Sequence, residues 1–427
     1  MMPAIEVRVP GGSTLMVEGE AVFELLEGEA EVFGINAGPG FKAKVDLYKA
    51  APVYTLKDSL LRIEGGKAWA EEGDTVPQSW RSLAEKIASE KPGKVMVIGP
   101  VDVGKSGLVT FLLNRLLASG LRVAVVDADT GQSDIGPPTT IGLGIAERQV
   151  VMLSEVPLYD AFFVGLTSPS GLLQRSVAGV ALMAEKGLAA GADVVLVDTT
   201  GWVYDPGGRD LKLAKAAALQ PDLIVAIDPG RSLSHLTRFL SKLYRVEVVE
   251  PAVKLRPRSR EERREIRRST YEKYFVGARD VELSFEDVVS GYSFVFSGEP
   301  LPREELEAIA GLLGVEVYYG EESGDSLVVF TDTPVPQAGV ELLSSVYDKR
   351  YVKAFTGPEL LHTLVAFGDR EKLFRGLGII KSVDPKDRRL VVYTPVEPSS
   401  GMYVQLGYIK VNPSTLEEEG WIERWSL

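Results

Sequence analysis

Hydrophobic positions divide the chain into three stretches with different periodicity. Residues 1–90 hold short apolar runs punctuated by glycine, such as EVRV, AEVFGI and LRIEGG, which predict a small N-terminal β domain. Across residues 91–277, near-continuous Val, Ile and Leu runs alternate with helical segments, which predicts a parallel sheet covered on both faces. After residue 277 that alternation is lost, and runs such as SLVVFTD and MYVQLGYIKV predict a mainly β C-terminal domain over 278–427. The expected fold is therefore a doubly wound α/β domain between two flanking β domains.

Several segments of the middle stretch carry strong element signals. An approach helix is expected in TVPQSWRSLAEKIASEKPGK, which ends at a Pro-Gly turn. The expected strands are KVMVIG, RVAVVDAD, QVVMLSE, ADVVLVDTT and DLIVAID. Doubly wound sheets bind ligands at the carboxyl ends of their strands, so the residues that follow these runs are the candidates for chemistry.

Composition restricts the possible functions. The chain has no cysteine, which excludes disulfides, thiolate zinc sites and a cysteine nucleophile. Its two histidines, His235 and His362, are too few for a histidine-rich metal site and are expected to be structural. The net charge of −13 means that any contact with nucleic acid must be local. The start has no leader-like pattern and no run reaches the ~18 apolar residues of a membrane span, so a cytoplasmic protein without membrane contact is expected.

The clearest motif is GPVDVGKS at residues 99–106, which fits G-x-x-x-x-G-K-[ST] between an apolar strand and an amphipathic helix. In such a loop the backbone N–H groups face phosphate oxygens and the helix N-terminus adds partial positive charge. Lys105 is expected to reach the β and γ phosphates, and the Ser106 hydroxyl to ligate Mg²⁺. The expected nucleotide-binding residues are Gly99, Pro100, Val101, Asp102, Val103, Gly104, Lys105, Ser106 and Gly107.

Two carboxylates follow the next apolar strand, in VAVVDADTGQ. Asp127 and Asp129 are two residues apart, so in a continuous strand they share a face beside the phosphate loop. One could steady Mg²⁺ while the other accepts a proton from an acceptor hydroxyl, or the pair could serve the metal alone. Both interpretations remain open from the sequence.

A further strand ends in DTTGW, residues 198–202. Asp-x-x-Gly also occurs in GTPases, which additionally carry a guanine-reading Asn-Lys element. None of Asn36, Asn114 and Asn412 is followed by lysine, so guanine specificity is disfavoured.

The strongest local departure from the acidic average is the segment KLRPRSREERREIRRSTYEK at 254–273, with nine basic and four acidic residues. A helix here would place its arginines on neighbouring faces, either as a solvated surface with i,i+4 pairs or as a lid over a triphosphate. Arginines in a lid can neutralise charge on a transferred phosphoryl group, because their planar fork pairs with phosphate oxygens.

Taken together, these segments resemble the polynucleotide 5′-hydroxyl kinases, which include archaeal RNA/DNA kinases and the eukaryotic RNA kinase of the pre-mRNA cleavage machinery. The resemblance is carried, in order, by GPVDVGKS, VDADTGQSDIGPP, DTTGW and the basic block that ends in EKYFVG, and it covers roughly the first two thirds of the chain. It implies ATP and Mg²⁺ as cofactors, and RNA 5′-hydroxyl ends as acceptors, with DNA as a further candidate.

The resemblance also implies roles for single residues. Lys105 and Ser106 would serve the phosphates and Mg²⁺, Asp129 would be the general base and a metal contact, and Arg258 and Arg263 would be the lid arginines. Gly165, Thr167, Pro169 and Ser170 resemble the family's clasp near the phosphate loop. The implied acceptor-binding residues are Gln132, Thr167, Thr199, Thr200, Gly201 and Trp202. The adenine would lie between the central and N-terminal domains.

Two other functions compete with the kinase. An ATP-bound scaffold of an RNA-processing complex would be free to lose Asp129, Arg258 and Arg263, all of which are present. A P-loop ATPase or small-molecule kinase would need neither Trp202 nor a basic block open to a polymer. The residues therefore favour the polynucleotide kinase.

Overall fold

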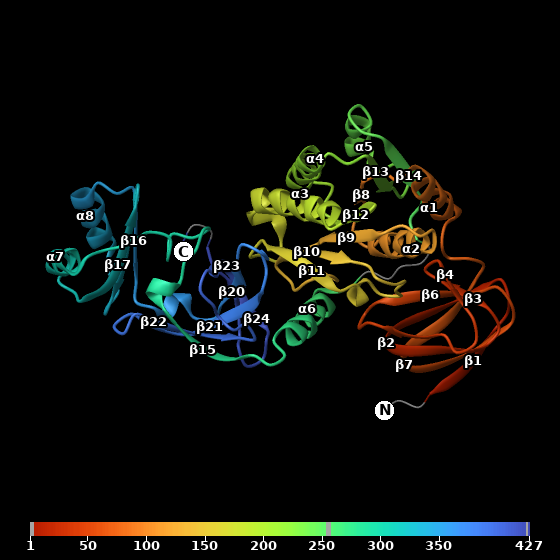
Figure 1. Ribbon diagram of the computed structural model, residues 1–427, viewed down its shortest axis with the longest axis horizontal. Coiled ribbons are helices and arrows are strands. Elements are labelled where there is room, and N and C mark those ends of the chain that lie inside the picture. Colours follow the sequence, from red (N-terminus) through yellow and green to blue (C-terminus); the bar gives the residue numbers. More distant parts are fainter. Residues whose placement is uncertain (1–3, 253–257, 424–425) are drawn as a thin grey trace. The chain divides into compact units, whose positions relative to one another are not determined.

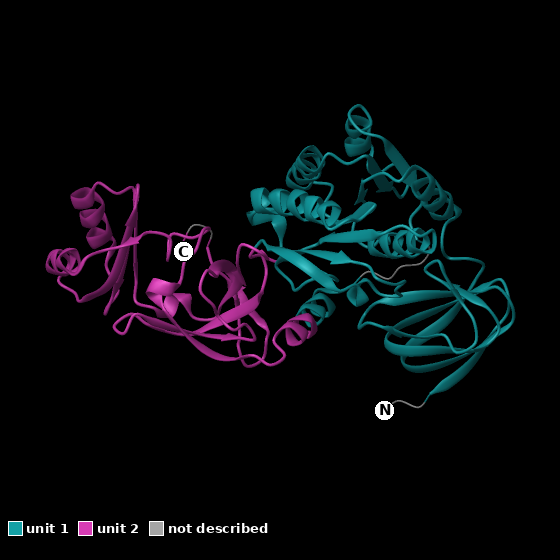
Figure 2. Cartoon of the chain, viewed as in Figure 1, with its two compact units in different colours: residues 1–164, 168–267 teal, residues 165–167, 268–427 magenta. Residues whose placement is uncertain are grey.

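The computed structural model describes residues 4–252, 258–423 and 426–427 (Figure 1). The chain forms two compact units, coloured separately in Figure 2. The first unit comprises residues 1–164 and 168–267, and the second comprises residues 165–167 and 268–427. The N-terminal sheet and the sheet that carries the phosphate loop both belong to the first unit, so the three-domain division remains a prediction.

The N-terminal part is an antiparallel seven-stranded sheet. Its strands are β1 (Ile5–Val9), β2 (Ser13–Glu27), β3 (Ala30–Val32), β4 (Ile35–Ala37), β5 (Lys42–Val45), β6 (Ala50–Thr55) and β7 (Ser59–Glu72). They are ordered β1-β7-β2-β6-β3-β4, with β5 paired to β2. Side chains that alternate along β2, such as Leu15, Val17 and Phe23, fill a core of their own, as period-two patterning predicts.

The second sheet of the first unit is the predicted doubly wound sheet. Its strands are β8 (Lys94–Ile98), β9 (Val123–Ala128), β10 (Thr140–Ile145), β11 (Leu158–Phe163), β12 (Val194–Thr199), β13 (Leu223–Ile227) and β14 (Val246–Val249). The order is β11-β10-β9-β12-β8-β13-β14, and the pairs from β9 to β14 are all parallel. The carboxyl ends of β9, β12 and β8 therefore meet at one edge.

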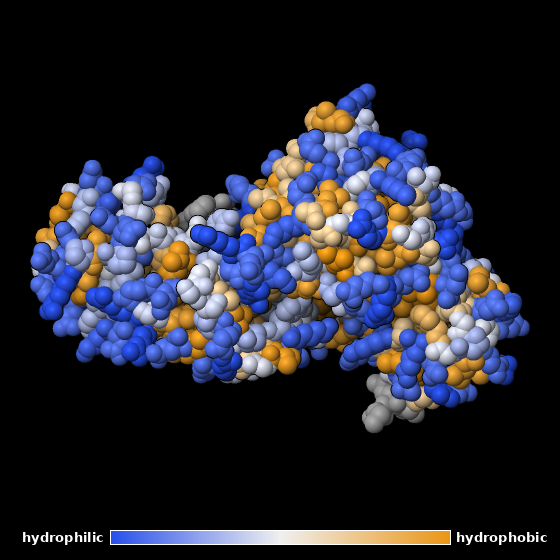
Figure 3. All heavy atoms as spheres, viewed as in Figure 1, coloured by the Kyte–Doolittle hydropathy of each residue, from blue (hydrophilic) through white to orange (hydrophobic). Residues whose placement is uncertain are grey.

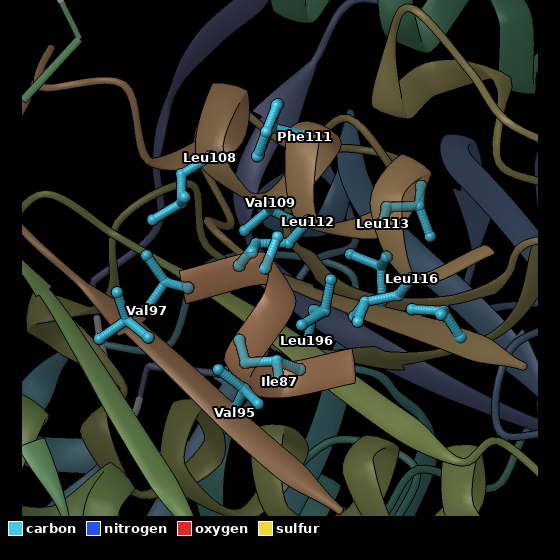
Figure 4. Close-up of a cluster of buried hydrophobic side chains, with 14 of the residues drawn as sticks. Ile87, Val95, Val97, Leu108, Val109, Phe111, Leu112, Leu113, Leu116 and Leu196 are labelled. Atoms are coloured by element: carbon cyan, nitrogen blue, oxygen red, sulfur yellow. The ribbon is translucent and has the colours of Figure 1, made fainter. Parts of the chain in front are cut away.

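Helices cover both faces of this sheet. The predicted approach helix is α1 (Gln78–Glu90), and it packs with α2 (Lys105–Ala118) on one face. Figure 4 shows Leu108, Leu112 and other α2 side chains gathered over Val95 and Leu196. On the other face lie α3 (Leu173–Ala189) and α4 (Pro206–Leu219), followed by α5 (Ser234–Leu240).

One predicted strand is wrong. QVVMLSE contains a short 3₁₀ turn at Leu153–Glu155, and the sheet is extended instead by the antiparallel pair β10 and β11. Val151 and Met152 are buried because they pack into the core of the N-terminal sheet. The apolar run therefore reflects contact between the two sheets.

The basic block forms the predicted helix, α6 (Arg260–Tyr274), while Lys254–Pro257 lie outside the described residues. The second unit has a six-stranded sheet of β15 (Arg279–Ser284), β20 (Thr363–Gly368), β21 (Gly376–Asp384), β22 (Arg389–Thr394), β23 (Tyr403–Val411) and β24 (Glu418–Trp421). A four-stranded sheet contains β16 (Glu299–Pro300), β17 (Val317–Ser323), β18 (Ser326–Thr331) and β19 (Tyr351–Phe355), with α7 (Arg303–Leu313) and α8 (Gln337–Tyr347). These helices interrupt the mainly β pattern expected there.

On the face shown in Figure 3, hydrophobic and hydrophilic residues are interspersed. Among the helices that the structure describes, none combines the length and the apolar character needed to cross a bilayer.

Candidate functional site

The phosphate loop lies where the sequence predicted, between β8 and α2. Gly104 adopts φ +95° as the residue before α2, a left-handed conformation that favours glycine. At Gly99 an added Cβ would lie 3.0 Å from Val103 Cγ2 and 3.1 Å from the Ile227 carbonyl oxygen. Both glycines thus allow the tight turn that directs the loop into the N-terminus of α2.

Lys105 is the first residue of α2 and is 9% exposed. Its Nζ donates to the Pro100 carbonyl oxygen at 2.6 Å, which folds the side chain back over the loop. Burial lowers the pKa of Lys105, and the nearby Asp198, Asp129 and Asp102 oppose that shift. Its ammonium group therefore lies in an acidic surrounding at the phosphate loop.

Asp198, the penultimate residue of strand β12, is the carboxylate that faces Ser106. The Ser106 hydroxyl donates to Asp198 Oδ2 at 2.6 Å, while Asp198 Oδ1 is buried and has no hydrogen-bond partner in the described structure. Burial raises the pKa of Asp198 to about 6, against the influence of Lys105 and Ser106. In the sequence, Asp198 stands out only as part of a GTPase-like motif. Its place at a strand end beside the phosphate-loop strand was the signal that could have singled it out.

Both carboxylate oxygens of Asp127 accept hydrogen bonds from the loop that follows β9. It is 2% exposed, and Oδ2 accepts hydrogen bonds from the amides of Asp134 and Ile135 and from the Ser133 hydroxyl, while Oδ1 accepts from the Asp129 amide. Burial raises its pKa, and Asp134 and Asp198 raise it further. Asp127 is the carboxylate that shapes the loop after β9.

Asp129 lies just beyond β9, which ends at Ala128. Its Oδ1 accepts from the amides of Gly131 and Gln132, each at 3.1 Å. The Gln132 Nε2 donates to the Arg263 carbonyl oxygen at 3.3 Å and to that of Gly131 at 2.6 Å, while its buried Oε1 has no partner in the described structure. Asp129 and Gln132 thus form a polar corner between the β9 loop and α6.

The two predicted lid arginines reach different parts of the first unit. Arg263 Nη2 lies 3.5 Å from Asp102 Oδ2, so α6 contacts the phosphate loop itself. Arg258 Nε donates to the Tyr48 carbonyl oxygen at 3.1 Å, and the Tyr48 hydroxyl donates to Glu265 at 2.8 Å. The turn of the N-terminal sheet at Tyr48 therefore holds the start of the basic helix.

The DTTGW residues mostly make internal contacts. The buried Thr199 hydroxyl donates to the Val97 carbonyl oxygen at 2.7 Å, and the Thr200 hydroxyl accepts from a lysine of α4. An added Cβ at Gly201 would lie 2.6 Å from the Val101 amide nitrogen, so this strand end passes close to the phosphate loop. Trp202 Nε1 donates to Asp205 at 2.6 Å. Acceptor contacts by this segment remain predictions.

The clasp residues are divided between the two units. Gly165 and Thr167 belong to the second unit, where the Tyr408 amide donates to the Gly165 carbonyl oxygen at 2.9 Å. Pro169 and Ser170 belong to the first unit, in a 3₁₀ turn that Ser168 caps. The role of Thr167 toward an acceptor remains a prediction.

Comparison with known proteins connects this site to a family. The chain is 36% identical over 355 residues to a polyribonucleotide 5′-hydroxyl-kinase of Pyrococcus furiosus, which covers 82% of this chain and 97% of that relative. The chain belongs to the polyribonucleotide 5′-hydroxyl-kinase family. A relative from Thermococcus kodakarensis with the same description is 36% identical over 354 residues, covering 82% of this chain and 97% of the relative.

More distant members of the family are eukaryotic. A polyribonucleotide 5′-hydroxyl-kinase Clp1 of Bos taurus is 29% identical over 278 residues, 60% of this chain and 64% of the relative. The family model described as mRNA cleavage and polyadenylation factor CLP1 P-loop matches residues 99–277. The solved Clp1p–Pcf11p (454–563) complex shares the fold, with a TM-score of 0.64 at 13% identity, covering 96% of this chain and 98% of that chain. The P-loop α/β fold and the family resemblance predicted from the sequence are thereby confirmed.

Proposed function

We propose that this chain transfers the γ-phosphate of ATP to the 5′-hydroxyl end of RNA. The observation that carries the proposal is the arrangement at one edge of the parallel sheet, where a phosphate loop, two aspartates and an arginine of a basic helix converge. Relatives that align over nearly their whole length are described as polyribonucleotide 5′-hydroxyl-kinases. An RNA end, as a linear polyanion with one terminal hydroxyl, suits an arginine-rich helix beside the loop.

The phosphate side of the site fits Mg²⁺. The metal prefers oxygen ligands, and the Ser106 hydroxyl pairs with Asp198, whose second oxygen is buried without a partner among the described residues. We propose that Ser106 and Asp198 hold the ion. When bound, Mg²⁺ would neutralise charge on the β and γ phosphates. Lys105 would then leave the Pro100 carbonyl oxygen and donate to the phosphate oxygens.

On the acceptor side, Asp129 is proposed as the general base. Gly131 and Gln132 donate to its Oδ1, which fixes the carboxylate at the end of β9. The ribose 5′-oxygen would form a bond to the γ-phosphorus as the bond to the β–γ bridging oxygen breaks. Asp129 would take the hydroxyl proton, and ADP would leave with the bridging oxygen.

Arg258 and Arg263 are proposed to stabilise the transferred phosphoryl group. Arg263 already lies at Asp102 of the phosphate loop, and Arg258 is anchored through its Nε to the backbone of Tyr48. Guanidinium groups in these places can pair with phosphate oxygens on which charge gathers during transfer.

The test uses γ-labelled ATP with four acceptors in parallel: a 5′-hydroxyl oligoribonucleotide, the same RNA carrying a 5′-phosphate, the matching oligodeoxyribonucleotide, and none. Label on the 5′-hydroxyl RNA alone, or on it and the DNA, supports the proposal. Label released as inorganic phosphate without an acceptor would indicate an ATPase. Bound ATP without any turnover would indicate a scaffold.

A further inference from the structure

Two lysines that the proposed chemistry does not use are buried beside it. Lys212 and Lys215 lie three residues apart on α4, so they occupy one face of the helix. Both are 0% exposed. Lysine usually keeps its ammonium group in water by extending its aliphatic stem, and full burial of the charge is costly unless it is compensated. A pair of buried lysines on one helix face therefore requires a source of compensation.

Each ammonium group contacts the carboxyl end of a different strand. Lys212 Nζ donates to the Thr200 carbonyl oxygen at 2.5 Å and to its hydroxyl at 3.1 Å, just after β12. Lys215 Nζ lies 3.5 Å from the carbonyl oxygen of Ala128, the residue between Asp127 and Asp129. That distance is long for a hydrogen bond, and no other hydrogen bond of Lys215 occurs within the described ranges.

The carbonyl oxygen that Lys215 approaches belongs to Ala128, which is flanked in sequence by the carboxylates of Asp127 and Asp129. Burial lowers the pKa of Lys215 to about 8, and Asp129, Asp127 and Asp198, in that order, oppose the shift. Two of these aspartates, Asp129 and Asp198, also act on Lys105 of the phosphate loop. Lys215 is thus the lysine of the pair whose ammonium group lies at the backbone of Ala128, the residue before the proposed base.

We propose that Lys215 is a positioning residue for phosphoryl transfer, whose positive charge holds the Asp129 carboxylate in place at the end of β9. Lys212 holds the neighbouring end of β12 through Thr200. An apolar residue would fill the same core position without burying a charge, so we attribute the lysine to its place at the end of β9, between two aspartates. This inference rests on the proposed function, because it gives Lys215 its effect through the proposed base.

A double-mutant cycle separates this role from a merely structural one. Lys215→Met, which keeps the length and removes the charge, is measured in the full chain alone and together with Asp129→Asn. We expect Lys215→Met to lower kcat with a 5′-hydroxyl oligoribonucleotide by about tenfold or more, with KM for ATP changed less than about threefold. In the Asp129→Asn background the same change should cost less than about twofold, because residues that act as a unit are not additive.

The control is Lys186→Met on α3, which removes a lysine paired with the buried Asp160. Its kcat should stay within about twofold of the unmutated chain. Equal losses from Lys215→Met in both backgrounds, or an equal loss from Lys186→Met, would overturn the inference.

Folding failure is also informative. If Lys215→Met unfolds alone but folds with Asp129→Asn, the charge pairing is supported. If it unfolds in both backgrounds, the lysine serves the core and the inference is wrong. If the unmutated chain transfers phosphate and Lys215→Met has the same kcat, the inference is wrong but the proposed function stands. If the unmutated chain phosphorylates no 5′-hydroxyl acceptor, the proposed function is wrong as well.

Discussion

Both compact units bury carboxylates, but they surround them differently. In the first unit Asp127 and Asp198 are 2% and 4% exposed, and the fully buried lysines of α4 approach from the same sheet edge. In the second unit Glu321 of β17 is 1% exposed and accepts hydrogen bonds from the amides of Phe296 and Gly298 and from the Tyr319 hydroxyl. No ion pair of Glu321 is found within the described parts of the chain.

The difference distinguishes the proposed site from a structural carboxylate. Neutral donors satisfy Glu321 completely, and burial raises the pKa of Glu321 to about 7, which favours its protonated form near neutrality. Asp198 keeps one oxygen without a partner in the described structure, and the positive charge of Lys105 acts on it. A buried carboxylate with cations nearby and an open oxygen is poised to take a ligand.

The largest expected effect comes from the cation of the phosphate loop. Lys105→Ala should lower transfer of labelled phosphate by about 10³-fold or more, because Lys105 is the positively charged residue of the GPVDVGKS loop that pairs with the β and γ phosphates. The fold should survive, since the change removes a buried charge. Lys94→Ala on β8, which removes a lysine paired with Glu185 of α3, is the matched control and should retain activity. Unchanged transfer by Lys105→Ala would contradict the nucleotide site.

The next effect concerns the lid. Arg258→Ala or Arg263→Ala should each lower kcat by about 10²-fold with a smaller change in KM, because the guanidinium charge matters most as transfer proceeds. Arg268→Ala serves as control within α6, since Arg268 pairs with Glu272 one turn away and should change kcat less than about threefold. An effect confined to KM for the oligonucleotide would make the helix a strand-binding surface instead.

The smallest effect tests the structural carboxylate. Because the pKa of Glu321 is raised to about 7 from 4.5, the folded state keeps a proton that the unfolded chain loses, so this stability is complete below about pH 4.5 and falls as pH rises toward 7. Glu321→Gln should remove about 1 to 3 kcal/mol of that pH dependence, without changing transfer. Amide hydrogen exchange of β17 and β18 in the full chain, at pH 5 and pH 8, measures it. An unchanged pH dependence would show that Glu321 is already ionised.

Much of the site could be predicted because it depends on short local patterns. The phosphate loop follows from glycines at fixed spacing between a strand and a helix, and α6 from its charged helical sequence. The distinction between Asp127 and Asp129 could not be predicted. Period two places both on one face of a strand, yet β9 ends at Ala128, so Asp129 leaves the strand while Asp127 is enclosed by the following loop.

Long-range burial accounts for the other failures. QVVMLSE is apolar because it packs on the N-terminal sheet, and the glycine-containing TIGLGI forms β10 instead. Nothing in the local sequence distinguishes Lys212 and Lys215 from solvated lysines of a helix. Their burial follows from their contacts with the ends of β12 and β9. The sequence contains no local signal that the ammonium group of Lys215 lies at the backbone of a residue 87 positions away.

We assign the general base to Asp129, after β9, and a metal ligand to Asp198, at the end of β12. Comparing Asp129→Asn with Asp198→Asn tests this assignment most directly. Calorimetric binding of ATP with Mg²⁺ and transfer to a 5′-hydroxyl oligoribonucleotide are measured for both variants. Asp129→Asn should bind ATP and Mg²⁺ within about threefold of the unmutated chain while transfer falls by about 10²- to 10⁴-fold, since asparagine cannot accept the proton. Asp198→Asn should weaken binding itself, because it removes a proposed metal ligand. If Asp129→Asn instead lost binding to the same degree as activity, Asp129 would be a metal ligand, and the base would have to be sought elsewhere.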